Sequence, residues 1–589
     1  MKDNPYLNTV KSKKNVVLLR LVRYILAHKW LVVAAAFLML TSNILGLIGP
    51  SISGRAIDTV AVGKGNVDFA KVFFYCGCMI GFYLVSSILA YLLSLVMIKL
   101  SRTIVMKMRE DVFEKLSELP VGFFDKIQAG DLISLISYDI DTVNASLSND
   151  LLQVCASVIT IVGSFIGMLL ISPTLLLVFV VTLPISILVA LRRSKTVRPL
   201  FKKRSAELGK MNGFIEETIS GSKTIKAYNR EAQILQRFDE KNAGAVQAYY
   251  DADYVSSAMG PSINFINNLS LALISTFGAM LFLFGKISIG NVSSFILYSR
   301  RFSGPINEIG NILSELQSAI SAADRVFRLI DAPPETPDKR DATDLTDVKG
   351  DIEFDHVTFG YDKDTPVIKD FSMQVHQGDL VAIVGHTGAG KTTLVNLLMR
   401  FYDVNSGMIR IDGQDISGVT RKSLRSAYTM VLQDTWLFEG SVFDNIAYGK
   451  ESAKLADVVR VSRAANIHEF IETLPQGYAT ILNEDGVNLS KGQKQLITIA
   501  RAMLNDSRIL ILDEATSNVD TLTEIQIQRA MNKLMSGKTC FVIAHRLSTI
   551  QNADRIVVMD NGQVAEQGTH ESLLRQNGVY ARLYHAQYE

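Results

Sequence analysis

The sequence is short of cysteine, tryptophan and charge. Its 589 residues include 4 cysteines and 2 tryptophans, and charged residues make up 20%, where about a quarter is usual for a soluble protein. The cysteines lie in apolar stretches or a strand-like run (Cys76, Cys78, Cys155 and Cys540), so neither a disulfide scaffold nor a thiolate metal site is indicated. The formal net charge is only +2, which excludes a nucleic-acid binder that relies on bulk positive charge.

Hydrophobic residues make up 48% of the chain, and the mean hydropathy is +0.21. They gather in apolar runs, each close to the roughly 20 residues that a helix needs to cross a bilayer core. The six runs comprise residues 30–48, 72–98, 154–171, 174–191, 264–284 and 292–312. Arg300 and Arg301 interrupt the sixth run, which is assigned as a span from the spacing and the even count. The sequence therefore predicts an all-α polytopic membrane domain of six helices with long cytoplasmic extensions.

Basic residues predict how these helices are oriented. Lysines and arginines are frequent between the second and third runs and between the fourth and fifth, but rare in the opposite loops. Because such residues collect on the cytoplasmic side, both long segments and both termini are expected in the cytoplasm. The start lacks the cleavage pattern of a signal peptide, and residues 18–27 are typical of an amphipathic surface helix. We expect a multi-pass protein of the cytoplasmic membrane.

Polar residues within the apolar runs have competing interpretations. Arg300 and Arg301 lie at bilayer depth, where ionisable groups are costly and face a cavity or a partner. Arg301 and Glu308 share a helix face, which favours a structural pair, or pairing across a dimer, over contact with a substrate. Three asparagines of the fifth run are similar candidates for a polar cavity wall (Asn264, Asn267 and Asn268).

The pattern changes at the proline-rich residues 331–338 (DAPPETPD), which are typical of a linker. Beyond them, short β-branched strands alternate with helices, for example at 380–384, 509–512, 540–543 and 555–559, and this alternation indicates an α/β domain. The expected division is a cytoplasmic segment with a surface helix (1–29), a transmembrane domain (30–330), a linker (331–349) and an α/β domain (350–589).

A phosphate-binding sequence follows the strand 380–384. Residues 385–392 (GHTGAGKT) match GxxxxGK[ST] and open a helix, which is the context that the motif requires. Its glycines let backbone N–H groups approach phosphates, and the helix N-terminus favours their charge. Lys391 is expected to reach the β- and γ-phosphates of ATP, and the Thr392 hydroxyl to ligate Mg²⁺. The expected binding residues of this P-loop are Gly385, His386, Thr387, Gly388, Ala389, Gly390, Lys391, Thr392 and Thr393.

The strand 509–512 (ILIL) ends in Asp513 and Glu514. An acid at the carboxyl end of a buried strand faces the nucleotide crevice of an α/β sheet. Asp513 then suits the water shell of Mg²⁺, and Glu514 is placed to polarise the attacking water. Behind a phosphate-binding loop, this acidic pair predicts a site of nucleotide hydrolysis.

Residues 489–493 (LSKGQ) resemble the LSGGQ signature of the ATP-binding cassette (ABC) superfamily. Tyr361 resembles that family's adenine-stacking aromatic residue, Gln433 its Mg²⁺-sensing glutamine and His545 its switch histidine, while residues 517–520 resemble its D-loop. The resemblance implies that Glu514, His545 and Gln433 are catalytic and that Thr392, Gln433 and Asp513 hold the metal. It also implies that nucleotide is bound by Tyr361, Ser490, Gly492, Gln493 and Asp520.

The membrane half resembles that of an ABC exporter half-transporter of the type IV fold. Residues 119–125 with Gly130 and Asp131 resemble its first coupling helix, and Glu216, Glu217, Gly221 and residues 226–228 resemble the second. The resemblance implies a two-chain ATPase. Each nucleotide would lie between one chain's P-loop and the other chain's signature, and closure of the cassettes would turn the membrane cavity outward.

Departures from the family pattern bear on the partner. Lys491 replaces the first glycine of the signature pair, Asn518 stands where alanine is frequent, and Asp485 replaces an expected arginine. Glu514 is intact. This combination resembles the catalytic-glutamate-bearing subunit of heterodimeric bacterial multidrug exporters, in which one composite site hydrolyses ATP and the other mainly holds it. A heterodimer is therefore favoured over a homodimer that tolerates Lys491.

The leading functional hypothesis is ATP-driven export of an amphipathic or hydrophobic solute, such as a drug or lipid, by alternating access. A lipid flippase is a second hypothesis. An ATP-gated channel or regulator is a third, which the intact Glu514 disfavours because a gate can lose hydrolysis without losing function. The implied cofactors are ATP and Mg²⁺. The implied partners are a second half-transporter subunit, membrane lipid and a small-molecule or lipid substrate, with no nucleic acid.

Overall fold

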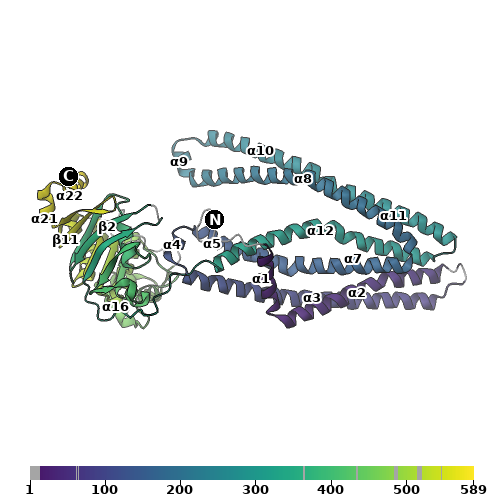
Figure 1. Ribbon diagram of the computed structural model, residues 1–589, viewed down its shortest axis with the longest axis horizontal. Coiled ribbons are helices and arrows are strands. Elements are labelled where there is room, and N and C mark those ends of the chain that lie inside the picture. Colours follow the sequence, from purple (N-terminus) through teal and green to yellow (C-terminus); the bar gives the residue numbers. More distant parts are fainter. Residues whose placement is uncertain are drawn as a thin grey trace. The chain divides into compact units, whose positions relative to one another are not determined.

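The computed structural model describes residues 14–61, 63, 66–362, 365–432, 435–482, 489–513, 520–544 and 547–588. The chain forms two compact units, coloured along the sequence in Figure 1. The first unit comprises Met1–Ser117 and Ile127–Ala332, and the second comprises Glu118–Lys126 and Pro333–Glu589. The short segment Glu118–Lys126 thus belongs to the second unit although it interrupts the first in sequence.

The first unit is built of helices, several of them long. They are α1 (Lys14–Leu26), α2 (Lys29–Val60), α3 (Phe69–Glu118), α5 (Ala129–Ser134), α6 (Ile140–Ala145), α7 (Leu151–Ile171), α8 (Pro173–Ser220), α9 (Ser222–Ala227), α10 (Glu231–Ser257), α11 (Met259–Leu283) and α12 (Ile289–Ile330). Two π-helical turns, η1 (Leu135–Asp139) and η2 (Ser146–Asp150), join α5, α6 and α7 into one helical stretch. The short α9 separates α8 from α10 (Figure 1), where the second coupling helix is expected.

Within the described residues, five helical stretches are long and apolar enough to cross a membrane, and they coincide with the first five apolar runs. The sixth run lies in α12, a helix of 42 residues in which Arg300 and Arg301 lower the hydropathy. At 50 and 48 residues, α3 and α8 greatly exceed the roughly 20 residues that a span requires. Leu170 and Leu283 are each 81% exposed, an arrangement that suits a lipid rather than an aqueous surrounding. The predicted fold class of this half is confirmed.

A tight turn joins α7 to α8. Ser172 caps α8, because its hydroxyl oxygen accepts a hydrogen bond from the Leu175 N–H at 3.3 Å. Pro173 follows in the first turn, where its missing N–H removes no helical hydrogen bond. The two residues therefore reverse the chain without room for an intervening domain.

Helix α12 packs closely against α2. A Cβ atom on Gly290 would lie 2.0 Å from the Gly54 carbonyl oxygen, so only glycine allows the two backbones to approach this far. Further along, Arg301 donates a hydrogen bond to the Gly46 carbonyl oxygen and lies 6.0 Å from the Tyr83 ring centroid. This contact gives Arg301 a partner within the helical unit, while the Glu308 side chain lies outside the described part.

The described part of the second unit contains three β-sheets. One is antiparallel, in the order β2 (Ile368–Val375), β1 (Ile352–Phe359), β4 (Ser406–Ile411) and β5 (Gln414–Asp415). A six-stranded sheet has the order β12 (Gln563–Gly568), β11 (Arg555–Asp560), β3 (Leu380–Gly385), β10 (Thr539–Ile543), β9 (Ile509–Asp513) and β6 (Tyr428–Val431). The third pairs β7 (Gly440–Ser441) with β8 (Ile481–Leu482). All four strands expected from the sequence are present in the six-stranded sheet.

The six-stranded sheet positions the candidate site. Its strands β11, β3, β10, β9 and β6 run parallel, and only β12 pairs antiparallel. The residue pairs Val542↔Ala382 and Ile543↔Asp513 set the register of β10 against β3 and β9. The carboxyl ends of β3 and β9 therefore reach the same edge, with β10 between them. In open α/β sheets this edge is where ligands bind.

Helices surround the sheets of the second unit. They are α13 (Lys391–Leu398), α14 (Arg421–Ser426), α15 (Val442–Ala447), α16 (Leu455–Ala464), α17 (His468–Thr473), α18 (Lys491–Asn505), α19 (Thr521–Met535), α20 (Leu547–Gln551), α21 (His570–Gln576) and α22 (Val579–Tyr588). Two hydrophobic cores result. One lies mainly between the six-stranded sheet and α15–α19, and the other includes β1, β2, β4 and α13. The predicted α/β domain is confirmed.

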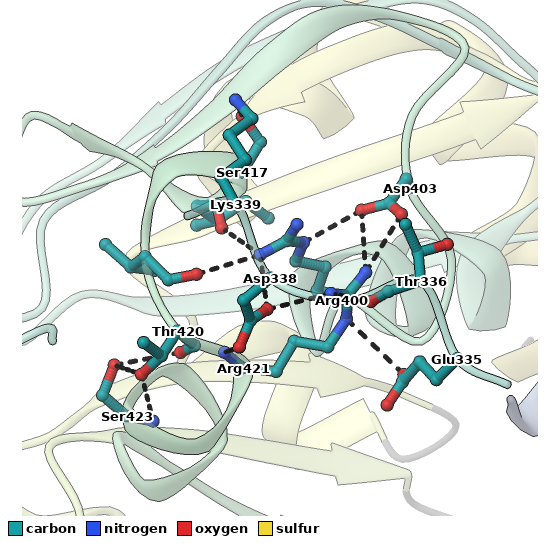
Figure 2. A network of polar contacts seen from close by, with 12 residues as sticks. Glu335, Thr336, Asp338, Lys339, Arg400, Asp403, Ser417, Thr420, Arg421 and Ser423 are labelled. Atoms are coloured by element: carbon teal, nitrogen blue, oxygen red, sulfur yellow. Dashed lines mark hydrogen bonds and ion pairs between the residues drawn. The ribbon is translucent and has the colours of Figure 1, made fainter. Parts of the chain in front are cut away.

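The linker is held to this unit by ion pairs, which Figure 2 shows from close by. Arg421 is 7% exposed, donates to the Asp338 carboxylate at 2.9 Å and to the Thr336 carbonyl oxygen at 2.6 Å, and also pairs with Asp403. Arg400 is 5% exposed and donates to Asp403 at 2.9 Å. The proline-rich segment is therefore an ordered part of the unit.

The segment expected as the first coupling helix forms α4 (Val121–Phe124) within the second unit. Phe123 is fully buried, and a Cβ atom on Gly122 would lie 2.8 Å from the Tyr402 ring. The Tyr402 hydroxyl donates a hydrogen bond to the Asp125 carboxylate at 2.5 Å. One tyrosine thus contacts α4 through both its ring and its hydroxyl group.

Candidate functional site

The P-loop connects β3 to α13 and adopts a conformation that needs glycine. Gly390 has a φ of +102°, in the left-handed region, and a Cβ atom there would lie 2.8 Å from Ile368 Cδ1. At Gly385, a Cβ atom would lie 2.3 Å from the Met559 carbonyl oxygen. Larger residues are excluded by both conformation and space. The loop therefore brings its backbone N–H groups and the N-terminus of α13 to the carboxyl edge of the sheet, where phosphates are favoured.

Lys391, Thr392 and Asp513 line one cavity of about 550 Å³ at this edge. The Lys391 ammonium group donates hydrogen bonds to the carbonyl oxygens of Gly385 at 2.8 Å and His386 at 3.0 Å. Burial lowers the pKa of Lys391, and the negative charge of Asp513 partly opposes this effect. The lysine is therefore partly desolvated beside a carboxylate, and the phosphates of a nucleotide would supply the anionic partner that favours its charged form.

Tyr361 lies at the rim of the same cavity. Its hydroxyl group is 3.2 Å from the Thr393 hydroxyl and accepts a hydrogen bond from the Asn396 side chain at 3.5 Å. Its ring meets the Tyr402 ring edge-on, with centroids 5.0 Å apart. At 39% exposure, the ring still has a face available to stack on a base, as the resemblance implies.

The signature residues begin α18. The Ser490 hydroxyl oxygen accepts a hydrogen bond from the Gln493 N–H at 3.2 Å, and the Gln493 side chain accepts one from the Ser490 N–H at 2.8 Å. This reciprocal capping box fixes the helix start. Lys491 occupies the first helical position and its side chain is exposed. Its backbone is right-handed helical, so this position makes no use of glycine's conformational freedom.

Several predicted site residues lie outside the described part of the chain. They are Gln433, Glu514 and His545, together with the signature-loop residue Asp485 and the D-loop residue Asn518. Asp520 is described, and its carboxylate caps α19 by accepting a hydrogen bond from the Thr523 N–H at 3.0 Å.

The two parts of the predicted composite site do not share one cavity. Tyr361, the P-loop and Asp513 share the cavity, whereas Ser490, Gly492 and Gln493 are not among its lining residues.

Three further residues of this region were not predicted from the sequence. Val367 and Ile543 line the cavity, and Tyr402 supports Tyr361. Val367 and Ile543 are ordinary apolar residues beside β2 and at the end of β10, so no local motif distinguishes them. Tyr402 could have been found from the sequence, because it lies just after the helix that the P-loop opens and is therefore close to the nucleotide site.

Comparison with known proteins decides the family. The family model described as "ABC transporter transmembrane region" matches residues 32–306, and that described as "ABC transporter" matches residues 368–517. The chain is also 43% identical to the "Uncharacterized ABC transporter ATP-binding protein YfiC" of Bacillus subtilis (strain 168), over 97% of this chain and 94% of that protein. The chain belongs to the ABC transporter family.

Two further comparisons cover nearly the whole chain. It is 39% identical to a "Fatty acid ABC transporter ATP-binding/permease protein" of Mycobacterium bovis (strain ATCC BAA-935 / AF2122/97), over 96% of each protein. It also shares 30% identity and a TM-score of 0.78 with the solved "Structure of a bacterial Atm1-family ABC exporter with ATP bound", over 95% of this chain and 98% of that one. The ABC transporter is thus a half-transporter of the exporter type, with one membrane domain fused to one cassette.

Family membership settles the general activity. The cassette binds ATP, and its hydrolysis is coupled to transport by a multi-pass membrane protein. A half-transporter of this fold functions as a dimer and acts on lipids or small molecules. The predicted family, fold class and ATPase activity are confirmed. The roles of the individual site residues stay predictions.

Proposed function

We propose that this ABC half-transporter exports an amphipathic or hydrophobic solute across the cytoplasmic membrane by alternating access. The main observation that supports this proposal is the cavity lined by the P-loop lysine, Thr392 and Asp513 at the carboxyl edge of the sheet. The glycine conformations of the loop and the partly desolvated Lys391 support nucleotide binding there. The name of the Mycobacterium bovis relative, a fatty acid transporter, supports a lipid-like solute.

Each nucleotide-site residue then has a chemical role. Lys391 holds the β- and γ-phosphates, and Tyr361 stacks on the adenine. Glu514 follows Asp513 directly and acts as general base on the attacking water. Gln433 and His545 orient the γ-phosphate region. On the opposing cassette, Ser490 can donate its hydroxyl proton to phosphate while its oxygen still accepts from the Gln493 N–H, because a hydroxyl group does both.

Magnesium fits the donor set of the cavity. Thr392 offers a hydroxyl oxygen and Asp513 a carboxylate, and Mg²⁺ in phosphate-transfer sites is held by one or two such groups plus substrate phosphates and water. Within the described ranges, no group of three or more His, Cys, Asp or Glu side chains could hold a metal by itself. We assign the metal to the nucleotide complex on this donor set, where it would neutralise phosphate charge.

The test of this mechanism is Glu514→Gln in the full-length transporter. Hydrolysis should fall by about 10²–10⁴-fold, the usual contribution of a general base, while ATP binding should stay intact because a general base acts on the attacking water and not on the bound nucleotide. Turnover is measured by phosphate release, and binding by titration with a fluorescent ATP analogue. Hydrolysis above about a tenth of the wild-type rate would contradict the assignment of the base.

Export is distinguished from lipid flipping and from gating by direction. Inverted vesicles that contain the transporter should accumulate solute only when ATP is added, and the solute should also stimulate hydrolysis. A flippase would instead move labelled lipid between leaflets without luminal accumulation. A channel would dissipate a solute gradient without accumulating against it. Either of these outcomes would replace export as the function.

A further inference from the structure

Helix α2 contains a buried proline, Pro50, just beyond its apolar run. Proline has no N–H group, so the helical hydrogen bond that residue 50 would donate to the Gly46 carbonyl oxygen, four residues earlier, is missing. Gly46 lies within the apolar run, where a carbonyl group without a donor is costly. Transmembrane helices keep such prolines where neighbouring helices satisfy the freed backbone group. A donor from another helix is therefore expected at Gly46.

Helix α12 supplies that donor. Arg301 donates a hydrogen bond to the Gly46 carbonyl oxygen at 2.5 Å, and its guanidinium group lies 3.5 Å from the hydroxyl oxygen of Tyr83 on α3. Tyr83 also stands against α2, because a Cβ atom on Gly49 would lie 2.0 Å from its hydroxyl oxygen. Three helices thus meet at the carbonyl group that Pro50 leaves free. The arginine that interrupts the sixth apolar run replaces the donor that the proline lacks.

Two further side chains of α12 donate to the same part of α2. The Tyr298 hydroxyl donates to the Leu47 carbonyl oxygen at 2.7 Å, and the Ser294 hydroxyl donates to the Pro50 carbonyl oxygen at 2.8 Å. Both side chains are buried. Because residues 294, 298 and 301 are three or four positions apart, they lie on one face of α12. That face therefore donates to the α2 carbonyl groups around the proline.

The contact continues to the ends of both helices. The Asp58 carboxylate accepts hydrogen bonds from the Ser288 hydroxyl and the Gly290 N–H, both at 2.7 Å. Between the two ends, a Cβ atom on Gly54 would lie 2.5 Å from the Gly290 carbonyl oxygen. We call residues 46–58 of α2 and 288–301 of α12 the α2–α12 seam. All of these contacts are made within one chain, and the expected orientation places the seam in the outer half of the membrane.

We propose that the α2–α12 seam is a latch on the outer side of the transporter and that Arg301 is its positioning residue. In the closed latch, Arg301 occupies the Gly46 carbonyl oxygen. When the cavity turns outward, α2 and α12 separate, and water replaces each partner of this hydrogen bond. The latch then opens without leaving a buried polar group unsatisfied. The inference rests on the proposed alternating access and deepens it by naming the helices that part.

The test is hydrogen–deuterium exchange of the full-length transporter in nanodiscs, followed by mass spectrometry of peptides that cover residues 43–57 and 289–301. Exchange should be slow without nucleotide and fast in Glu514→Gln with ATP, which holds the cassettes closed. Arg301→Gln should raise the nucleotide-free exchange rate about fivefold, the weight of one hydrogen bond between membrane helices. Arg301→Lys keeps a donor and should stay close to wild type. Exchange that ignores both ATP and Arg301→Gln would overturn the latch.

Pro50→Ala gives the sharpest comparison, because it returns an N–H group to the Gly46 carbonyl oxygen. In that background Arg301→Gln should change the exchange rate by less than about twofold, the usual error of such a double-mutant cycle. Pro184→Ala is the matched control, since Pro184 lies inside α8, and it should leave the fivefold effect intact. An equal effect of Arg301→Gln with Pro50 and with alanine at that position would refute the role of the Gly46 carbonyl group.

Arg300→Gln controls for charge, because Arg300 is the neighbouring, exposed arginine of the same helix. This variant should exchange like wild type, and an increase equal to that of Arg301→Gln would assign the effect to charge rather than to the seam.

Tyr298→Phe is a second test of the latch that does not depend on folding of Arg301→Gln. It should also raise the exchange rate about fivefold. Pro50→Ala should not reverse this increase, because the Leu47 carbonyl group has Ser51 as its helical donor in either background. Exchange at the wild-type rate in Tyr298→Phe would count against the seam as a latch.

Uptake into inverted vesicles, measured on the same variants, separates this inference from the proposed function. Exchange that responds to ATP and to Arg301→Gln, combined with no ATP-driven uptake, would support the latch and refute export. ATP-driven uptake combined with exchange that ignores ATP and Arg301→Gln would leave export in place and refute the latch.

Discussion

At the scale of single residues, we propose that Lys391 holds the phosphates of the nucleotide. Its ammonium group donates hydrogen bonds to two carbonyl oxygens, and burial holds its pKa below the ordinary value. Lys391→Ala should weaken ATP binding by roughly tenfold or more, since hydrogen bonds to charged groups contribute about 1.5–3 kcal/mol. Equilibrium titration with a fluorescent ATP analogue measures this loss.

The lowered pKa of Lys391 also predicts how ATP affinity depends on pH. As the pH rises through the lowered pKa of Lys391, the free protein loses the proton that phosphate binding requires. ATP affinity should therefore decline at a pH below the ordinary lysine pKa of about 10.4. The Lys391→Ala variant has no such proton, so its weaker affinity should not show this component of the decline. If ATP affinity declined with pH in the same way in both proteins, the charge of Lys391 would not be responsible for phosphate binding.

At the scale of secondary-structure elements, α4 is connected to the nucleotide cavity through Tyr402. The Tyr402 hydroxyl group bonds to Asp125 beside α4, and its ring lies 5.0 Å from that of Tyr361. Tyr402→Phe removes the hydroxyl group and keeps the ring. Basal ATPase activity should stay close to wild type, while stimulation by transported solute should fall by about fivefold, as expected for a hydrogen bond worth about 1 kcal/mol.

Asp125→Asn is the companion variant, because an amide can still accept the tyrosine hydrogen bond. It should preserve more of the stimulation than Tyr402→Phe does. Vesicle uptake assays run beside phosphate release would show whether hydrolysis and transport separate. A Tyr402→Phe protein with normal stimulated turnover and normal uptake would show that the contact has no part in coupling.

The linker network of Figure 2 gives a prediction about stability. Arg421→Ala would remove one partner from each of Asp338 and Asp403, while Arg400 would still donate to Asp403. Hydrogen bonds to charged groups contribute about 1.5–3 kcal/mol, so the free energy of unfolding should fall by about 2 kcal/mol and the cassette should unfold at a lower temperature. Arg460→Ala is the matched control, because Arg460 is 72% exposed and pairs only with Asp457 nearby. That variant should change the free energy of unfolding by less than about 1 kcal/mol.

Thermal unfolding of the full-length protein, followed by differential scanning fluorimetry with and without ATP, makes the comparison. Equal melting temperatures for the two variants would mean that the network does not stabilise the cassette. A lower melting temperature for Arg421→Ala with unchanged ATP binding would separate this structural role from the nucleotide site.

Elements that depend on local pattern were predictable from the sequence, and contacts between distant segments were not. The strands β3, β9, β10 and β11 follow from β-branched runs, and the P-loop follows from its glycines. The burial of Phe123 within the second unit and the contact of Tyr402 with Asp125 join positions some 280 residues apart. The spacing of apolar residues along the chain does not indicate which distant residues will pair. The π-helical turns η1 and η2 are also invisible to apolar spacing.

At the scale of the whole molecule, one chain provides half of each composite site in the proposed dimer. Its P-loop and Asp513 line the cavity, while its signature serves the partner's nucleotide. Lys491 stands at the first position of α18 with an exposed side chain. A cation there is unfavourable for the helix itself and would enter the opposing nucleotide site. We propose a heterodimer, in which this chain's Glu514 belongs to the main hydrolytic site and its Lys491 to the weaker one.

Two substitutions distinguish the heterodimer from a homodimer. In a heterodimer, Lys491→Gly should change turnover only modestly, because it alters the weaker site, whereas Glu514→Gln should nearly abolish turnover even with an unaltered partner. In a homodimer, Lys491 lines both equivalent sites, so restoring glycine should change hydrolysis substantially. The decisive preparation is this chain purified by itself, checked for its oligomeric state by light scattering and for phosphate release in nanodiscs. We expect little hydrolysis until a second, different half-transporter is added, and robust activity of the single polypeptide would establish the homodimer instead.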